Sequence, residues 1–446
     1  MPNLKIDISC RRSVIACFLG IVVGLVWFDG LLFASAVVVK PPTSMFGARV
    51  HQLRAFVFRS KAWSEIDLQI DEVNSRGDYV LEDGEPYTRG TDDGLIDEWD
   101  DIVLRNKDFG DELLKKDLDL FSTDVREFWV LDLRTQGKIF SVLITQDQVP
   151  ATLNFSSLKT PKVDADFDEK SGRVESSLYQ YDFQKKHPML LGALKIRDGK
   201  NPQILHNVFQ DAKFYMPLRT VWWLPNYSVT VDELQSQIEC WRTGVIRSII
   251  AVGVRYRKFL GLIDTHLFSE LVFYKDSFSI PTMIEFVFDP STYLRTGSGL
   301  LMGLQFDPQR PWVIDQTNLP SVTDPNTQMS DSKFYVEGSD QGKSMFFYLQ
   351  MQADSEAFEG GSRPLLIRKQ DFKSQALLKS SPWLASIQAD LGIFTDVSKA
   401  VKGSYRFGLD LVVGYEPKAL REVVDSKQNV SWRSPMQGTR KNPTPL

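Results

Sequence analysis

The sequence of 446 residues contains few cysteines and few histidines. Two of its three cysteines, Cys10 and Cys17, fall within the first 36 residues, which leaves Cys240 without a partner for an internal disulfide. The four histidines are far apart in the sequence, and none has the spacing of zinc ligands. The sequence therefore predicts neither a disulfide-stabilised scaffold nor a histidine-based metal centre.

Familiar catalytic and nucleotide-binding motifs are also missing. No Gly-x-Ser-x-Gly nucleophile elbow occurs. Residues 338–344 resemble a phosphate-binding loop, but one residue is missing between the glycines and an aromatic strand follows instead of a helix. We expect a β-hairpin over residues 333–351 that binds no nucleotide. Because Cys240 precedes a stretch rich in Val and Ile, we expect an inert core residue and not a nucleophile. We find no catalytic residue, which argues against an enzyme.

Positive charge is neither abundant nor clustered. The formal net charge is −5, which makes the chain a poor candidate for binding nucleic acid. A hydrophobic share of 43% with 24% charged residues is ordinary for a globular protein. A chain of this length can bury a core large enough to fold without disulfides, and we expect two or three lobes.

The first 36 residues have the layout of an export signal. Lys5, Arg11 and Arg12 precede an apolar stretch at 13–27, and Ala34-Ser35-Ala36 offers a small-x-small cleavage pattern. We predict a signal peptide over residues 1–36, cleavage after Ala36, and a periplasmic or secreted protein. The apolar stretch is shorter than the ~20 residues that span a bilayer, so we expect no transmembrane segment after cleavage. The alternative is that the segment is retained as an anchor.

The rest of the chain is typical of a mostly β protein with antiparallel strands, β-sandwich lobes and a few short helices. Alternating or short apolar runs are bounded by turn residues throughout. The capping pair Thr230 and Glu233 predicts one short helix, and a second is expected at 417–424. Strands are expected at 54–59, 66–70, 127–134, 138–145, 240–257, 271–274, 282–288, 333–337, 345–351 and 405–413.

Changes in composition suggest how these strands are divided. We predict an N-terminal β lobe with an acidic loop over residues 37–155 and a polar linker over 156–177. One larger sandwich lobe, or more than one, follows over 178–425. A polar tail over 426–446 contains Pro and Gly, and we expect it to be disordered.

The most informative stretch runs from 91 to 112 and crowds carboxylates around one Asp-Gly turn. With Gly94 at the sharp turn, Asp93, the Leu95 carbonyl, Asp97 and Asp100 have the spacing of later calcium ligands. This half resembles the calcium loop of EF-hands and dockerins, and the resemblance implies a bound calcium ion. The first half of the loop departs from the pattern, because Arg89 and Thr91 occupy positions 1 and 3.

A neighbouring strand could supply the missing oxygen ligands. Residues 66–73 end in Asp71 and Glu72, and pairing with residues 101–104 would bring that acidic end close to the turn. The alternative is an ordinary acidic turn, since Asp-Gly favours turns without any ion. The predicted calcium ligands are Asp93, Leu95 through its carbonyl, Asp97, Asp100, Asp71 and Glu72.

Two short phrases resemble patterns in other protein classes. The run Arg-x-Gly-Val-Ile-Arg at 242–247 resembles a phrase common in large β-sandwich domains of carbohydrate-active proteins. Residues 69–72, 93–97 and 107–111 together resemble a pattern in exported proteins of unassigned function, which implies no activity. Trp222, Trp223 and Trp241 could stack on sugars, but buried aromatic packing is the commoner use of such residues.

These observations favour a binding or structural module exported to the cell envelope or the extracellular space and stabilised by calcium. Its partner would be an unidentified ligand or envelope protein, with a glycan among the candidates. Two alternatives stay open: a glycan-active hydrolase or lyase that uses paired carboxylates, and an accessory subunit of an envelope complex.

Overall fold

We analysed a computed structural model of the chain, and it is mostly antiparallel β structure, as the sequence predicts. Among the described residues, none lies in a helix long and apolar enough to cross a membrane. The structure describes residues 21–22, 36–75, 77–84, 93–114, 116–118, 128–135, 137–146, 163–198, 201–221, 226–258, 263–286, 289–307, 312–314, 332–340, 343–353, 365–368, 391–396, 398, 403–414 and 429–433.

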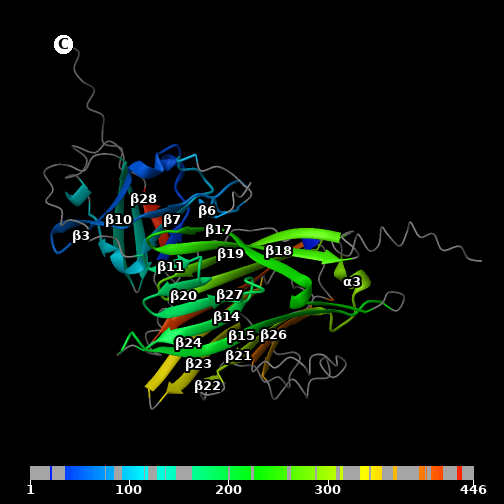
Figure 1. The fold of residues 1–446 in the computed structure, drawn as a ribbon. Coiled ribbons are helices and arrows are strands. Elements are labelled where there is room, and N and C mark those ends of the chain that lie inside the picture. Colours follow the sequence, from blue (N-terminus) through cyan, green and yellow to red (C-terminus); the bar gives the residue numbers. More distant parts are fainter. Residues whose placement is uncertain are drawn as a thin grey trace, which may run out of the picture.

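Two sheets form the N-terminal lobe (Figure 1). The larger has the strand order β28 (Asn429–Arg433), β9 (Phe128–Thr135), β10 (Lys138–Gln146), β3 (Leu53–Arg59) and β4 (Ala62–Ile66), with β8 (Gly110–Asp111) also on β10. The smaller, which we call the middle sheet, has the order β2 (Ala36–Val39), β7 (Asp101–Arg105) and β5 (Gln69–Asp71).

The large lobe is a sandwich of two wide sheets. In the described residues the first, which we call the front sheet, has the order β22 (Trp312–Ile314), β23 (Ser332–Asp340), β24 (Lys343–Ala353), β27 (Gly403–Gly414), β20 (Ser277–Phe286), β19 (Ile263–Tyr274), β18 (Arg247–Lys258), β17 (Leu234–Thr243) and β6 (Asp83–Gly84), with β1 (Ile21–Val22) on β20. The second has the order β11 (Ala165–Asp168), β12 (Arg173–Ser176), β13 (Tyr179–Phe183), β14 (Leu191–Arg197), β15 (Leu205–Leu218), β21 (Gly299–Phe306), β26 (Leu391–Asp396) and β25 (Leu365–Arg368), with β16 (Tyr227–Thr230) on β15.

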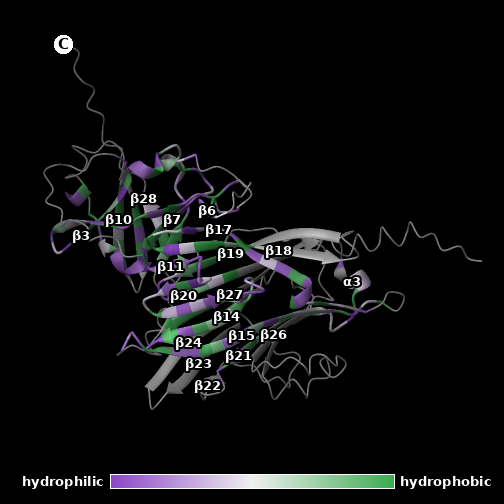
Figure 2. Ribbon diagram, viewed as in Figure 1, coloured by the Kyte–Doolittle hydropathy of each residue, from purple (hydrophilic) through white to green (hydrophobic). Residues whose placement is uncertain are grey.

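Apolar residues from both wide sheets form one continuous core between them. Tyr181 and Phe183 of β13 meet Phe273 of β19 and Phe278 of β20 edge to face, with ring centroids 4.9–6.0 Å apart. Figure 2 shows the corresponding alternation of hydrophobic and hydrophilic bands along the strands. The period of two that predicted strands therefore also decides which side chains enter this core.

The middle sheet is buried on both faces, and this arrangement positions the site described below. In β7, Ile102 and Leu104 pack toward the larger N-terminal sheet, whereas Val103 packs with Ile249 and Tyr274 of the front sheet. The lobes therefore stack as successive layers, with the middle sheet against the outer face of the front sheet.

Several expected local structures are confirmed. Strands β9 and β10, which the sequence predicts at 127–134 and 138–145, pair with each other from Thr135 and Lys138 outward. Strands β23 and β24 pair antiparallel, so the phosphate-loop-like residues belong to a hairpin. The capping pair Thr230 and Glu233 begins a single 3-10 turn, η4 (Val231–Glu233). The expected helix at 417–424 lies outside the described residues.

Two expected boundaries are wrong. The segment 156–177 is not simply a linker, because β11 and β12 within it pair edge to edge and extend the second wide sheet. The segment 426–446 is not wholly a tail, because β28 pairs with β9 and the Trp432 indole donates a hydrogen bond to the Lys40 carbonyl at 2.9 Å. Long-range partners outweigh local polarity at both places. Two strands also lie at least partly inside the expected signal, since β1 pairs with β20 and Ala36 of β2 pairs with Arg105. The signal over residues 1–36 stays a prediction.

Candidate functional site

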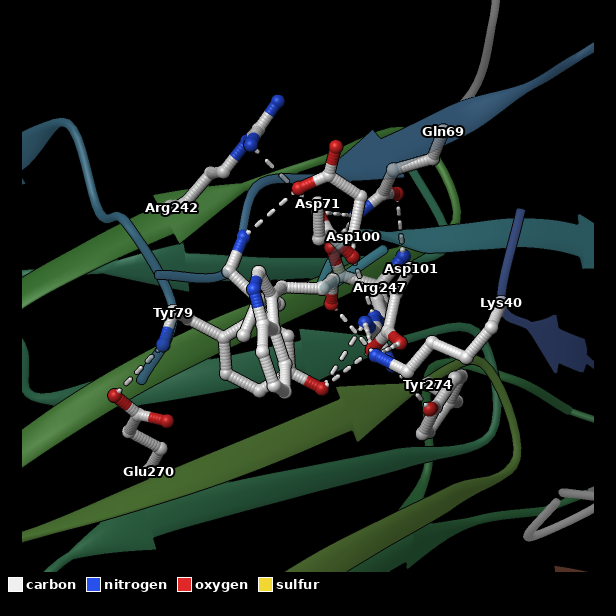
Figure 3. Close-up of polar contacts among 12 residues, drawn as sticks. Lys40, Gln69, Asp71, Tyr79, Asp100, Asp101, Arg242, Arg247, Glu270 and Tyr274 are labelled. Atoms are coloured by element: carbon white, nitrogen blue, oxygen red, sulfur yellow. Dashed lines mark hydrogen bonds and ion pairs between the residues drawn. The ribbon is translucent and has the colours of Figure 1, made fainter. Parts of the chain in front are cut away.

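A dense group of ionisable side chains lies between the middle sheet and the front sheet, around Arg247 (Figure 3). This arginine opens β18, and only 2% of it is exposed. Its Nε atom donates to Asp71 at 2.6 Å, and Nη2 donates to Asp101 at 2.8 Å. Its Nη1 atom donates to the Tyr274 hydroxyl at 2.9 Å. Every one of these bonds links sequence-distant strands, and those to Asp71 and Asp101 join the two lobes.

Gln69 holds the turn that precedes Arg247. Its side-chain oxygen accepts the backbone N–H groups of Ile246 and Arg247 at 2.8 and 3.0 Å. Its side-chain nitrogen donates to the Arg247 carbonyl at 3.1 Å and to Asp71 at 2.9 Å. Gly244 makes this approach possible, because a Cβ atom there would lie 2.3 Å from the Gln69 amide. Gln69 of the N-terminal lobe therefore binds the turn between β17 and β18 of the large lobe through its side-chain amide.

A second arginine reaches across in the opposite direction. Arg105 of β7 donates through Nε to Asp164 at 2.5 Å and through Nη2 to the Val245 carbonyl at 2.8 Å. It is also paired with Asp67 of its own lobe. Arg247 thus extends from the large lobe and Arg105 from the N-terminal lobe, and we call the pair with their partners the arginine clamp.

Cations and carboxylates face one another around Arg247. Lys40 lies 2.6 Å from Asp101 on the side away from Arg247, so two cations face the carboxylates of Asp71 and Asp101. Burial alone would raise the pKa of Asp101, but the nearby charges of Arg247 and Lys40 outweigh it and hold that pKa below its usual value. Asp101 is therefore ionised at neutral pH, and the clamp contains ion pairs and not neutral hydrogen bonds.

Aromatic rings enclose the guanidinium of Arg247. Its central carbon lies 5.2 Å from the ring centre of Tyr79 and 5.8 Å from that of Tyr274. The Tyr79 hydroxyl donates to Asp101 at 2.7 Å, and its backbone N–H donates to Glu270. These contacts exclude water and fix the arginine in one orientation. The arrangement suits a structural junction, because the charged groups are directed at each other.

The acidic turn is held by its own backbone and carboxylates. Gly94, where the sequence predicts a sharp turn, has a φ of +68°, a left-handed conformation that favours glycine. Asp93 accepts the Leu95 N–H at 2.8 Å, and Asp97 accepts the Trp99 N–H at 2.6 Å. Each carboxylate therefore closes a short local turn.

The structure brings only some of the predicted calcium ligands together. Strands β5 and β7 pair as the sequence predicted, with Asp71 opposite Asp101. Asp71, however, is directed at Arg247, whereas Asp100 accepts the N–H groups of Val73 and Asp97 at 3.1 and 2.8 Å. Glu72 is buried, with 6% exposed. Within the described ranges, no cluster of three or more His, Cys, Asp or Glu side chains is arranged to hold a metal ion.

Asp100 should make stability depend on pH. Burial raises its pKa to about 6, although the bonds from Asp97 and Val73 act in the opposite direction. A carboxyl whose pKa is higher in the folded state stabilises the fold fully at pH values below its unfolded-state pKa, here near 3.8. This stabilisation is lost as the pH rises through the folded-state pKa of about 6. Relative to Asp100→Asn, which does not ionise, wild type should lose up to about 3 kcal/mol of unfolding free energy between pH 4 and 7.

Urea melts across this pH range, with a chelator present, measure the effect. Asp182→Asn on β13 serves as a control with the opposite sign. Hydrogen bonds from Arg173 and Lys195 outweigh burial there and lower the pKa of Asp182, so its contribution is lost as the pH falls. Parallel pH profiles for wild type and Asp100→Asn would contradict the assignment.

Sequence reasoning missed Gln69, Arg105 and Arg247 as members of one site. The available signal was a polar or charged residue within a strongly apolar strand, such as Arg247 before Ser248-Ile249-Ile250. Cys240 is wholly buried, in line with an inert core residue. Trp241 stacks edge to face on Phe167 with centroids 5.3 Å apart, which is core packing. Trp222 and Trp223 lie outside the described residues.

Comparison with known proteins yields weak likenesses. No family model matches the chain, and no curated protein matches it significantly. Among solved structures, it is similar to an α-mannosidase from Enterococcus faecalis V583, with a TM-score of 0.37 and 9% identity over 92% of this chain and 45% of that one. It is also similar to a glycosyl hydrolase family 38 protein from Enterococcus faecalis, with a TM-score of 0.32 and 9% identity over 86% of this chain and 48% of that one. The chain spans less than half the length of either neighbour, and at these scores neither assigns it an activity.

Proposed function

We propose that this chain is an exported two-lobed β-sandwich protein that acts as a binding or structural module of the cell envelope or the extracellular space. The observation that carries the proposal is the arginine clamp. Arg247, Asp71 and Asp101 are buried, and the arginine pairs with both carboxylates. A catalytic carboxylate pair must instead reach a substrate, which Asp71 and Asp101 do not.

The clamp also favours two lobes that are held rigidly together over two lobes that move about a hinge. Enzymes that close over a substrate need an interface that separates at low cost. Here Gln69, Arg105 and Arg247 bond to backbone or carboxylates across the interface, and β28 returns from the end of the chain to the N-terminal lobe. A rigid stack of sheets offers fixed surfaces to a ligand or a partner protein.

A paired assay tests the proposed function. The purified protein is incubated with a panel of soluble bacterial, fungal and plant polysaccharides, and binding and release of reducing ends are both measured. Retention of the protein on a glycan or on an envelope protein without release of reducing ends supports a binding module. Release of reducing ends or of unsaturated products at any polysaccharide would establish the glycan-active alternative.

Variants of the clamp provide the control. Arg247 is buried, so it is not part of a solvent-exposed binding surface. If the protein is a binding module, Arg247→Met should reduce binding only in proportion to the loss of folded protein. Circular dichroism on the same samples gives the folded fraction. If the variant stays folded and loses a polysaccharide-cleaving activity, the clamp residues take part in catalysis and the proposal fails.

Calcium stabilisation of the acidic turn forms part of the proposal. It is supported by the Gly94 turn and by the three carboxylates of Asp93, Asp97 and Asp100 on one short loop. A partial loop should bind weakly, with a dissociation constant of roughly 10⁻⁴ to 10⁻³ M. At ten times that concentration, calcium would add roughly 1.4 kcal/mol to stability.

Thermal melts with calcium and with chelator test this prediction. The wild-type melting temperature should rise slightly with calcium, and Asp97→Asn should abolish the rise. The same change at Asp164 should not, because that carboxylate is bound to Arg105 in the clamp. Identical melts for wild type in both conditions would leave an acidic turn that binds no ion.

A further inference from the structure

Strands β19 and β20 are neighbours in the front sheet, but they pair over only part of their length. All 12 residues of β19 pair with β18, and all 10 residues of β20 pair with β27. Between β19 and β20, in contrast, the ladder pairs among the described residues are limited to Val272 with Ser279 and Phe273 with Phe278. Beyond Ser279, β20 therefore has an edge that β19 does not cover.

The ladder on the other side of β20 shows which backbone groups face this edge. The Val413 N–H donates to the Asp276 carbonyl at 2.8 Å, just before the register begins with Ser277 opposite Val412. Opposite residues of an antiparallel pair alternate between hydrogen-bonded and non-hydrogen-bonded pairs. The even-numbered residues of β20 are therefore bonded to β27, and the odd-numbered residues direct their N–H and C=O groups away from it. On the uncovered edge the odd-numbered residues are Pro281, Met283 and Glu285.

Pro281 occupies a position that suits an edge strand. Proline has no N–H, and within sheets it is found where that side of the strand faces no neighbour. Pro281 lies opposite Gly408 in a non-hydrogen-bonded pair, so it removes no bond from the ladder with β27. Met283, two residues further along, keeps both its N–H and its C=O on the uncovered edge.

The chain itself places a strand on part of this edge. Ile21 and Val22 of β1 pair antiparallel with Phe286 and Glu285. Among the described strands, none pairs with residues 281–284 on this side. β1 belongs to the apolar stretch of the predicted export signal, so removal of the signal would also remove β1. The backbone groups of Met283 and Glu285 would then face solvent, and such an edge readily accepts a further strand.

We propose that the edge of β20 from Pro281 to Phe286 binds an extended apolar segment of a partner protein, which adds to the front sheet as an antiparallel strand. β1 is itself apolar and extended, and it shows that this edge accepts such a strand. Main-chain hydrogen bonds to Met283 and Glu285 supply the affinity. Before the signal is removed, β1 occupies the same edge and competes with the partner. The inference rests on the export part of the proposed function and names the kind of partner that the binding module takes.

Peptide binding to the full-length chain tests the inference. The probe is a fluorescein-labelled synthetic peptide with the sequence of residues 18–27 and terminal lysines for solubility, and its anisotropy is measured in a mild detergent. Val22→Pro removes the N–H through which β1 bonds to Glu285. The variant should therefore bind the peptide about tenfold more tightly than full-length wild type. The exported protein without its signal should bind like the variant. Equal binding by wild type and Val22→Pro would contradict the competition.

Two substitutions at one position test the backbone pairing, both in the Val22→Pro chain. Met283→Pro removes the N–H that faces the edge and no bond of the ladder with β27, so it should weaken peptide binding about tenfold. Met283→Ala keeps that N–H and should bind like its parent. Circular dichroism shows whether both variants are folded. Equal binding by two folded variants would overturn the proposal.

A modified peptide gives a test that does not depend on how Met283→Pro folds. A peptide that is N-methylated at every residue has the same side chains but no backbone donors, so it should not bind the Val22→Pro chain. Binding as tight as that of the unmodified peptide would refute strand addition. Dimerisation of Val22→Pro without peptide would assign the edge to a second copy of the chain and refute a partner segment. None of these results depends on the polysaccharide assay, so failure here and failure of the proposed function can be told apart.

Discussion

Replacing Arg247 with methionine should lower the free energy of unfolding by about 3–5 kcal/mol, the typical cost of removing one member of a buried ion pair. The substitution leaves Asp71 and Asp101 without the cation that each contacts at 2.6–2.8 Å. Methionine fills a similar volume, so the loss reports on charge more than on a cavity. The midpoint of urea unfolding, followed by tryptophan fluorescence and circular dichroism, measures the change.

Arg173→Met is the matched control for this prediction. Arg173 also pairs with carboxylates, Asp182 and Glu175, but its side chain is 35% exposed on the second wide sheet. Exposed pairs contribute at most about 1 kcal/mol, so this variant should unfold almost like wild type.

Removing a carboxylate in the same background provides a further check. Asp71→Asn combined with Arg247→Met should recover part of the stability, because no uncompensated charge then remains at that position. Equal losses for Arg247→Met and Arg173→Met would show that the buried clamp does not hold the lobes together.

Gly244→Ala should destabilise the protein by about 2–4 kcal/mol, because the new Cβ atom displaces the Gln69 side chain from the hairpin tip. That Cβ would stand 2.3 Å from the Gln69 amide, which makes hydrogen bonds to Ile246, to Arg247 and to Asp71. Gln69 is only 5% exposed, so its displaced amide has little access to water. The loss is measured by the same urea melts.

A double-mutant cycle makes this prediction specific to the contact. In the Gln69→Ala background the clash disappears, so Gly244→Ala should cost much less there than in wild type. Gly137→Ala is a contrasting variant, because Gly137 has a φ of +75° and open space around its Cβ position, so its cost reports left-handed backbone strain alone, which Gly244 does not have. If Gly244→Ala costs the same with and without Gln69, the effect belongs to the backbone and not to the clamp.

Local patterns determined much of the fold. Alternating apolar residues located β3, β9 and β10, and the Asp93-Gly94 pair located a left-handed turn. The pairing of β5 with β7 followed from two neighbouring apolar runs. The polarity of residues 156–177 and 426–446 suggested the wrong outcome, because an edge strand such as β11 or β28 can be polar on one face and still pair with a sheet.

The candidate site depended on contacts that no local pattern encodes. The sequence singled out the phrases at 69–72 and 242–247 separately, but nothing in either phrase indicates that they bind each other across 178 residues, as Gln69 and Arg247 do. The sequence assigns Asp71 to calcium because pairing of residues 66–73 with 101–104 would bring it close to the acidic turn. Its actual partner is Arg247 of β18, because the Asp71 side chain lies on the face of β5 that packs against the front sheet.

The sequence by itself determined the β class, the positions of most strands and the sharp turn at Gly94, because these follow from short-range periodicity and backbone sterics. Only the tertiary structure decided that the middle sheet is buried on both faces and that Arg105 and Arg247 reach across the interface between the two lobes in opposite directions. A buried charge is stable only beside its counter-charge, and the stacking of sheets brings distant carboxylates and arginines together.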